Sequence, residues 1–352
     1  MALCRSRSTP ETIRELGRGA KSTMRSEHDF AQKLRGHMSR WAEVHGLAEC
    51  VESDRGRPWV LAEAHRTRNL FRQEWWDHIQ GLEHRWVRAL NSSQCFAVNL
   101  FATLAKDPSG ANRFLRSMLP ERRITPADDV VVKFEHSPSG VPERLGERGQ
   151  PTQIDVFFEV VREGRICGAI GVEVKLSESE FGGCRGWNGV RETEPINPHR
   201  ERCLDARRVL ESPETECFMA EREGRRYWSL MGGGVGDSFD PDRLAQQDHC
   251  PFRHGLYQMM RNRVALDVFR SITGAEWTNF VVCVHRANQA VARLPEPVAG
   301  ESNAVAAFRN LLHPGSVLEW DASEVLEAIV AAEGGTAEWA AWMRDKYLLG
   351  EA

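Results

Sequence analysis

Three ionisable side chains lie on two apolar segments that have the composition of buried strands. Residues 152–161, TQIDVFFEVV, carry Asp155, and residues 168–176, GAIGVEVKL, carry Glu173 and Lys175. Side chains alternate between the two faces of a strand, so Glu173 and Lys175 project together and Asp155 can meet them from the adjoining strand. Two close carboxylates repel each other unless a cation lies between them, and carboxylate oxygens suit Mg²⁺ or Mn²⁺. The pattern therefore predicts a divalent-metal site, where Lys175 orients or helps to deprotonate a water and stabilises charge on a phosphate oxygen.

Lysine is rare in this chain, which makes Lys175 informative. Arginine supplies forty of the 46 basic residues, and the six lysines are at positions 21, 33, 106, 133, 175 and 346. Against that background, a lysine within an apolar strand indicates a function rather than ordinary surface charge.

The composition is that of a globular protein, with 41% hydrophobic residues, 27% charged residues and a formal net charge of −4. One or two domains with a large core are expected. A net charge of this size does not predict nucleic-acid binding over the whole surface, so any such binding must be local. Clusters of arginine within 113–123, 200–208 and 222–226 are typical of solvated surface, with phosphate binding as the alternative.

The sequence favours a cytoplasmic protein with reduced cysteines. Residues 1–22 lack the apolar stretch of a secretion signal, and no segment is long and apolar enough to cross a bilayer. The nine cysteines are an odd number, which argues against a disulfide framework and for free thiols or metal ligands.

The hydrophobic pattern predicts secondary structure in the order helix, three strands, helix, strand. The first helix begins at the cap residues Asn91 and Ser92 and ends before Pro108. The strands are β-branched and aromatic runs, and the last two of the first three are joined by the short turn segment REGR. The elements after that helix are expected at 129–136, 152–161, 166–176, 252–270 and 277–285.

Composition divides the chain into four parts. We expect a mobile tail over 1–25, a helical cap over 26–80 with helices joined near SDRGRP, and a core over 81–290. The core is interrupted by an irregular, cysteine- and arginine-rich insertion over 181–250. A segment of short helices over 291–352 follows the core.

The order of elements, with Asp155 on the second strand and Glu173-Val174-Lys175 on the third, resembles the PD-(D/E)XK nuclease superfamily. The resemblance implies an α/β fold with a restriction-endonuclease-like αβββαβ core, a mixed central sheet, and helical extensions at both ends. It further implies that Asp155, Glu173 and the Val174 carbonyl bind Mg²⁺ or Mn²⁺ and that Lys175 orients the attacking water.

Two departures from the superfamily pattern stand out. Ile154 occupies the position of the proline after which the superfamily is named, although that position varies among its members. Many members also carry a glutamate on the first core helix, whereas residues 92–105 contain no acid. Glu83, upstream of the helix, and Gln94, on it, are the candidates to replace that ligand; the alternatives are a surface position for Glu83 and a capping role for Gln94.

The helix within 252–270 carries a polar strip beside its apolar stripe. Tyr257 and Arg261, like Gln258 and Asn262, are four residues apart and so share a helix face. The segment YQMMRN is similar to a Gln/Tyr helix that flanks the catalytic pocket in some branches of the superfamily, although the spacing differs. Tyr257 and Gln258 are therefore candidate active-site residues, the alternative being the solvated edge of a packed helix.

Four cysteines fall within the insertion or at its end, and they are candidate ligands of a structural metal. Four thiolates bind Zn²⁺ tetrahedrally or hold an iron–sulfur cluster. Their spacing is not diagnostic, because no C-x-x-C pair is present, and the alternative is that they are ordinary buried cysteines. They are Cys184, Cys203, Cys217 and Cys250.

These features predict a divalent-metal-dependent nuclease that hydrolyses phosphodiester bonds of nucleic acid, with DNA the expected partner. One alternative is a non-catalytic nucleic-acid-binding or assembly protein on a degenerate nuclease fold, and another is a hydrolase of a different phosphate ester. The sequence leaves open RNA against DNA, single against double strands, internal against terminal cleavage, and any protein partner or oligomer.

Overall fold

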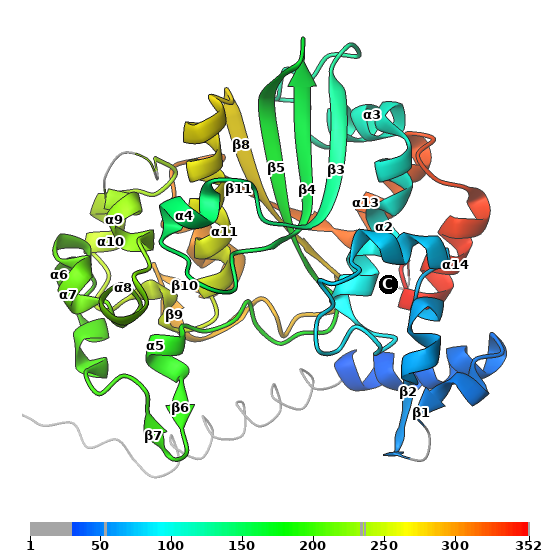
Figure 1. Ribbon diagram of the computed structural model, residues 1–352, viewed down its shortest axis with the longest axis horizontal. Coiled ribbons are helices and arrows are strands. Elements are labelled where there is room, and N and C mark those ends of the chain that lie inside the picture. The colour runs from blue at the N-terminus through cyan, green and yellow to red at the C-terminus, as the bar shows by residue number, and fades with distance from the viewer. Residues whose placement is uncertain (1–29, 53–54, 233–234, 236, 351–352) are drawn as a thin grey trace, which may run out of the picture.

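The protein is described by a computed structural model that covers residues 30–52, 55–232, 235 and 237–350. Its centre is a five-stranded mixed sheet with the strand order β11-β8-β5-β4-β3 (Figure 1). Strand β5 is antiparallel to β4 and parallel to β8, and β8 is parallel to β11. The strands are β3 (Asp129–His136), β4 (Ile154–Arg162), β5 (Arg165–Lys175), β8 (Trp277–Val284) and β11 (Val317–Asp321).

Helices cover both faces of this sheet (Figure 1). One face packs against an apolar cluster that includes Val156, Phe158 and Val172, and the other against a cluster that includes Phe157 and Phe280. A sheet buried on both faces leaves its strands almost continuously apolar. The first face carries α2 (Ser93–Lys106), α3 (Pro108–Met118), α13 (Ala322–Ala331) and α14 (Ala337–Tyr347), and the second carries α11 (Tyr257–Thr273) with α4 (Val141–Leu145).

The predicted core order of helix, three strands, helix and strand is confirmed. Helix α2 begins where its cap residues predict, because the Ser92 side chain accepts a hydrogen bond from the Cys95 amide. Strands β4 and β5 are joined by a tight turn in which Glu163 and Gly164 both have positive φ, as the predicted short hairpin requires. The predicted helix end near Pro108 is followed at once by a second helix, α3, because proline is well tolerated at a first helical position.

The C-terminal segment differs from the prediction of short helices alone. It contributes the edge strand β11, which pairs in parallel with β8 over Val317–Asp321. It also supplies α12 (Ala304–Asn310) and the antiparallel pair β9 (Arg293–Val298) and β10 (Glu301–Asn303). This strand lies at the edge of the sheet and has only five residues, VLEWD, which are partly exposed. A segment this short gives little apolar alternation by which a strand could be predicted.

The predicted helical cap also differs from expectation. Residues 30–44 are helical, but Arg57 and Pro58 of the SDRGRP segment lie in a strand that pairs with Val51–Glu52 instead of joining helices. The remaining turns are 3-10 helices, and the predicted tail over 1–25 lies outside the described residues. The elements are η1 (Ala48–Cys50), β1 (Val51–Glu52), β2 (Arg57–Leu61), η3 (Glu63–Asn69) and η4 (Gln73–His78).

The insertion is more regular than its composition suggests. It folds into short helices beside the sheet (Figure 1), which glycine and proline interrupt every few residues. They are α5 (Arg185–Asn188), η5 (Arg200–Leu204), α6 (Ala206–Glu211), α7 (Pro213–Glu216), α8 (Phe218–Glu223), α9 (Tyr227–Gly232), α10 (Pro241–Ala245) and η6 (Pro251–Arg253), with the small hairpin β6 (Val190–Arg191) and β7 (Glu194–Pro195). No helix in the described part of the chain meets the length and apolarity needed to cross a membrane.

Segments far apart in sequence meet at a buried lysine. Lys346 on α14 is fully buried, and its Nζ donates to the backbone oxygen and to Oδ1 of Asn69, at 2.6 and 2.7 Å. The rings of Trp41, Trp342 and Tyr347 lie around the same nitrogen. Burial lowers the pKa of Lys346 to about 7, because an apolar surrounding disfavours the charged form.

This buried amine predicts a pH dependence of folding. The unfolded chain keeps the lysine protonated up to a pKa of about 10.4, whereas the folded chain releases the proton near pH 7. The free energy of unfolding should therefore rise relative to that of Lys346→Met by about 1.4 kcal/mol per pH unit between these values. Denaturant titrations at several pH values measure it. Lys346→Gln must behave as Lys346→Met does, and parallel pH curves for wild type and variants would contradict the prediction.

Candidate active site

The hairpin of β4 and β5 brings the three predicted residues together. Val156 pairs with Val172, so Asp155 and Glu173 occupy the next opposed positions of the two strands. Val172, Val174 and Leu176 enter the core on the α2 side, which leaves Glu173 and Lys175 on the α11 side, as strand alternation predicts. Asp155 and Lys175 are each 8% exposed and Glu173 is fully buried, so the site has little water to screen its charges.

Lys175 is paired inside this site. Its Nζ lies 2.7 Å from Glu173 Oε1 and donates to Gln258 Oε1 at 3.1 Å. Burial lowers the pKa of Lys175, but the negative charges of Glu173, Glu178 and Asp155 outweigh burial and raise it above the ordinary value. Lys175 therefore remains a cation at neutral pH.

The site disfavours the charged form of Asp155. Its Oδ2 accepts a hydrogen bond of 2.7 Å from the Val174 amide. Burial, followed by the charges of Glu173 and Glu135, raises the pKa of Asp155 well above its ordinary value, although Lys175 and the Val174 amide act in the opposite direction. A divalent cation near this carboxylate would remove the repulsion.

The third carboxylate, Glu135, was missed in the sequence. It lies on β3, is 4% exposed, and has a positive φ of 45°. The pairing of β3 with β4 keeps one register on both sides of Glu135, with Phe134 opposite Val156 and His136 opposite Ile154, so Glu135 lies opposite Asp155. Side chains at opposed positions of antiparallel strands lie close together on one face of the sheet, so the register of β3 against β4, which the sequence alone does not give, brings Glu135 to Asp155.

Gln94 and His84 hold Glu135 in place. Gln94 is 2% exposed, its Nε2 donates to Glu135 Oε1 at 2.9 Å, and its Oε1 accepts from the His84 amide at 2.9 Å. His84 Nε2 lies 3.2 Å from Glu135 Oε2, and this contact raises the pKa of His84 despite partial burial. Gln94 thus supports a carboxylate from β3 at the point where the superfamily often has an acid on the first helix.

Glu83 lies at a different place. It lines a shallow hollow of about 350 Å³ together with Gln150 and Gln153, and it is half-buried. Its neighbour His84 contacts Glu135. His84, the residue after the candidate acid Glu83, is the feature of the sequence that could have pointed to this part of the site.

Helix α11 closes the site from the other side. Asn262 is 1% exposed and its Nδ2 donates to Glu173 Oε2 at 2.7 Å, while Gln258 accepts from Lys175. These two residues are four apart and therefore share one face of the helix. Tyr257 was expected beside them, but it lines a separate cavity with the cysteines of the insertion, because one residue along a helix turns the side chain by about 100°.

The side chains present suit a hard divalent cation. Glu173 Oε1 and Glu135 Oε2 are buried, and their only close polar neighbours among the described residues are Lys175 and His84, so a bound cation would share these oxygens with the lysine and the histidine. An oxygen donor set of this kind fits Mg²⁺ or Mn²⁺. Among the described residues, no three His, Cys, Asp or Glu side chains already form a metal-binding group, so the carboxylates would have to turn toward a bound ion.

Comparison with known proteins identifies the family of this chain. A family model described as Restriction Endonuclease associating with ARP matches residues 54–348. The match covers most of the chain and contains both strands of the β4–β5 hairpin and helix α11. No curated protein and no solved structure matched the chain.

The repulsion at Asp155 makes a testable prediction. Its raised pKa means that the carboxylate weakens the fold as pH rises above the unfolded value of about 4. Asp155→Asn keeps an oxygen for the Val174 amide and removes the charge, so it should stabilise the metal-free protein at neutral pH by roughly 1–2 kcal/mol. Thermal unfolding in a chelator between pH 4 and 8 measures this gain.

The same variant should lose stabilisation by Mg²⁺, because a ligand raises stability only through binding the folded state. Glu159→Gln is the matched control: Glu159 is on the same strand, but its Oε1 lies 2.6 Å from the Lys133 ammonium nitrogen. It should gain no stability. A destabilised Asp155→Asn, or an unchanged response to Mg²⁺, would contradict the metal-site interpretation.

Proposed function

The chain belongs to the restriction endonuclease family whose model it matches, and we propose that it is a divalent-metal-dependent nuclease that hydrolyses phosphodiester bonds of DNA. The observation that carries the proposal is the convergence of Asp155, Glu173 and Lys175 from two adjacent strands in a buried site. Glu135 from a third strand adds a further carboxylate.

The residues divide into cation-binding and charge-stabilising groups. Asp155, Glu173 and Glu135 would hold Mg²⁺ or Mn²⁺, and the Val174 carbonyl is a further candidate ligand. Such an ion, when bound, polarises a phosphate oxygen and lowers the pKa of a bound water.

Lys175 then acts as a cation rather than as a base. Its raised pKa keeps the proton on Nζ, so it orients a water by donating a hydrogen bond and opposes negative charge that develops on a phosphate oxygen. Gln258 fixes the direction of this ammonium, and Asn262 fixes the Glu173 carboxylate. These contacts support positioning of water and phosphate by groups whose geometry is set before the substrate arrives.

A hollow beside the site provides a path for DNA. It has a volume of about 950 Å³ and is bounded by His84 and by Ser177 and Glu178, which are two and three residues after Lys175. Three arginines and two tryptophans also line it: Arg35, Arg57, Arg85, Trp59 and Trp86. Arginine binds phosphate, and an exposed aromatic ring stacks on bases.

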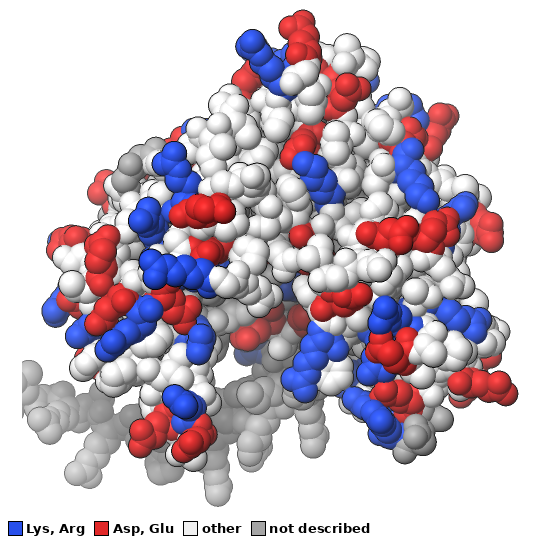
Figure 2. Space-filling view, in the orientation of Figure 1, with Lys and Arg blue, Asp and Glu red and all other residues white. Residues whose placement is uncertain are grey.

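Two of these arginines are available for phosphate. In the part of the chain that the structure describes, Arg35 and Arg85 form no ion pair; they lie over the rings of Trp59 and Trp86, at 5.8 and 5.1 Å. Trp86 is 53% exposed. Elsewhere on the face seen in Figure 2, basic and acidic side chains alternate. Local positive charge in this hollow supports binding of DNA there, although the net charge of the chain is negative.

Cleavage assays test the proposed activity. Purified protein is incubated with labelled linear duplex, circular duplex and single-stranded DNA in Mg²⁺ or Mn²⁺. Asp155→Asn and Lys175→Ala should each lower the cleavage rate by about 100-fold or more, because each removes charge stabilisation at the reacting phosphate. Lys133→Ala, a lysine of β3 paired with Glu159, is the matched control and should retain activity.

Cleavage that survives in both Asp155→Asn and Lys175→Ala would reject the proposal. Binding of DNA without cleavage in any metal would support the non-catalytic alternative.

Binding assays test the path for DNA. In the Asp155→Asn background, where cleavage is expected to be lost, Arg35→Ala and Arg85→Ala should weaken DNA binding. Each should also reduce the slope of log affinity against log salt by roughly one, since each removes a phosphate contact. Arg165→Ala, an exposed arginine at the start of β5 far from Lys175, is the control. An unchanged salt slope in both hollow variants would place the DNA elsewhere.

A further inference from the structure

Four cysteines of the insertion surround one cavity on the far side of α11 from the carboxylates. They come from separate short elements: Cys184 precedes α5, Cys217 precedes α8, Cys250 precedes η6, and Cys203 lies in η5. All four line the same cavity, whose remaining wall is largely aromatic and includes Trp187, Phe218, Trp228 and Phe252. Successive cysteines are 14 to 33 residues apart in sequence, yet all four lie around this one cavity.

Backbone amides lie beside two of the four sulfurs. The amides of Gly186 and Trp187 approach the Cys184 thiol. The amides of Met219 and Ala220 approach the Cys217 thiol in the same pattern: in each case they belong to the second and third residues after the cysteine. Backbone N–H groups stabilise a negatively charged sulfur, as they do a carboxylate.

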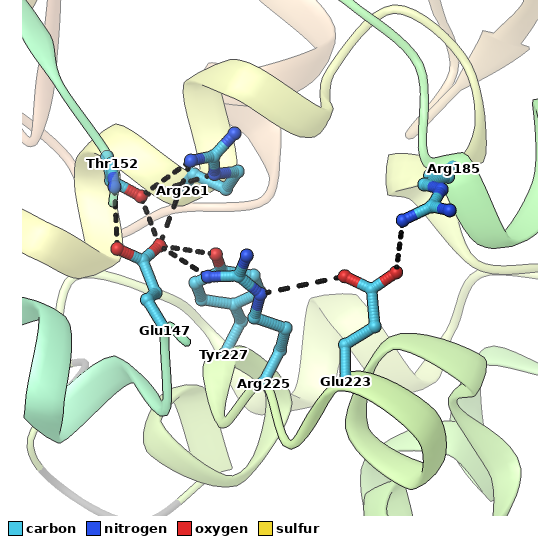
Figure 3. Close-up of polar contacts among 7 residues, drawn as sticks. All are labelled: Glu147, Thr152, Arg185, Glu223, Arg225, Tyr227 and Arg261. Carbon is cyan, nitrogen blue, oxygen red and sulfur yellow. Dashed lines mark hydrogen bonds and ion pairs between the residues drawn. The ribbon is translucent and has the colours of Figure 1, made fainter. Parts of the chain in front are cut away.

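Direct contacts hold the cysteine-bearing elements together. The Cys250 amide donates to the Cys203 carbonyl at 2.8 Å. Arg185, next to Cys184, donates to Glu223 at 3.0 Å and so joins α5 to α8 (Figure 3). The positions of the sulfurs are therefore fixed by more than apolar packing.

A buried carboxylate anchors this unit to the core. The Glu147 carboxylate is fully buried and accepts hydrogen bonds from the Thr152 amide and from the Tyr227 hydroxyl, both at 2.6 Å (Figure 3). Thr152 leads into β4, whereas Tyr227 lines the cysteine cavity. Arg225 connects Glu147 to Glu223 at 3.4 and 3.8 Å. The cavity is thus tied to the strand that carries Asp155.

We propose that this cavity is a metal centre in which the insertion is held together by thiolates bound to zinc or to the iron of an iron–sulfur cluster. Its ligands are Cys184, Cys203, Cys217 and Cys250. Both occupants use the same soft thiolate chemistry. The proposal does not rest on nuclease activity.

The dimensions of the cavity bear on which occupant it takes. The free space is about 20 Å³, which is room for about one water molecule. A single zinc ion fits this space if the sulfurs turn inward, since no described group is already placed for coordination. An iron–sulfur cluster is larger, so it would require the residues that line the cavity to move outward.

The centre would also fix one wall of the active site. Tyr257 and Met260 of α11 line the cavity, while Gln258 and Asn262 of the same helix contact Lys175 and Glu173. The amides of Tyr257 and Gln258 further bond to the carbonyls of Gly182 and Phe181, just before Cys184. Loss of metal should therefore loosen α11 and the two side chains that position the catalytic groups.

Metal analysis tests the proposal. Wild-type protein purified without oxygen is assayed for zinc, iron and acid-labile sulfide, and its visible spectrum is recorded. Zinc without sulfide, or iron with sulfide and visible absorption, each supports a thiolate centre and identifies the occupant. Cys184→Ser and Cys217→Ser should each lose most of the metal and unfold at a lower temperature, with circular dichroism as the check on folding.

Two controls separate this centre from other sites. Cys167→Ser alters a buried cysteine whose thiol donates to Val160 on the central sheet, and it should retain the metal. Asp155→Asn should also retain it, because the carboxylate site is separate. In the loaded wild type, the four thiols should resist alkylation until a chelator is added. A folded wild type without zinc or iron, or unchanged metal content in both Cys184→Ser and Cys217→Ser, would overturn the proposal.

Discussion

Repulsion between carboxylates in a buried site is the constraint on which the rest of this structure depends. Asp155 lies near Glu173 and Glu135, and burial together with their charges raises its pKa well above the ordinary value. A single lysine, Lys175, offsets part of that charge. Such an arrangement weakens the fold unless a cation is bound, so the surrounding structure must supply stability from elsewhere. The sheet does so by burying both of its faces under helices.

Helix α11 connects the two chemically distinct regions of the protein. Its Gln258 and Asn262 contact the charged groups of β5, and its Tyr257 and Met260 line the cysteine cavity. Arg263 anchors the same helix to the sheet through a hydrogen bond to Thr278 of β8, while a buried pair with Asp267 of α11 holds its guanidinium in place. A rigid helix transmits the position of one face to the other, so order in the insertion and order in the carboxylate site are coupled through packing.

Much of the core and part of the site were predictable from local pattern. Strands with strong β-branched runs were placed within a few residues, and strand alternation put Glu173 and Lys175 on one face, where they lie. Elements with weak patterns were missed or misread: β11 is a short edge strand, Arg57 and Pro58 begin a strand of a hairpin, and the insertion is a set of short helices. These depend on pairing and packing with distant segments, which local periodicity does not report.

By itself, the sequence determined the family, the α/β class and the two acidic residues and lysine at the centre, because hydrophobic period and residue type act locally along the chain. Only the tertiary structure decided that Glu135 joins them, since the register of β3 against β4 places it opposite Asp155. The fold also separated Tyr257 from Gln258 and brought four widely spaced cysteines to one cavity. Both outcomes depend on how α11 is rotated against the sheet and the insertion, an orientation set by packing between elements remote in sequence.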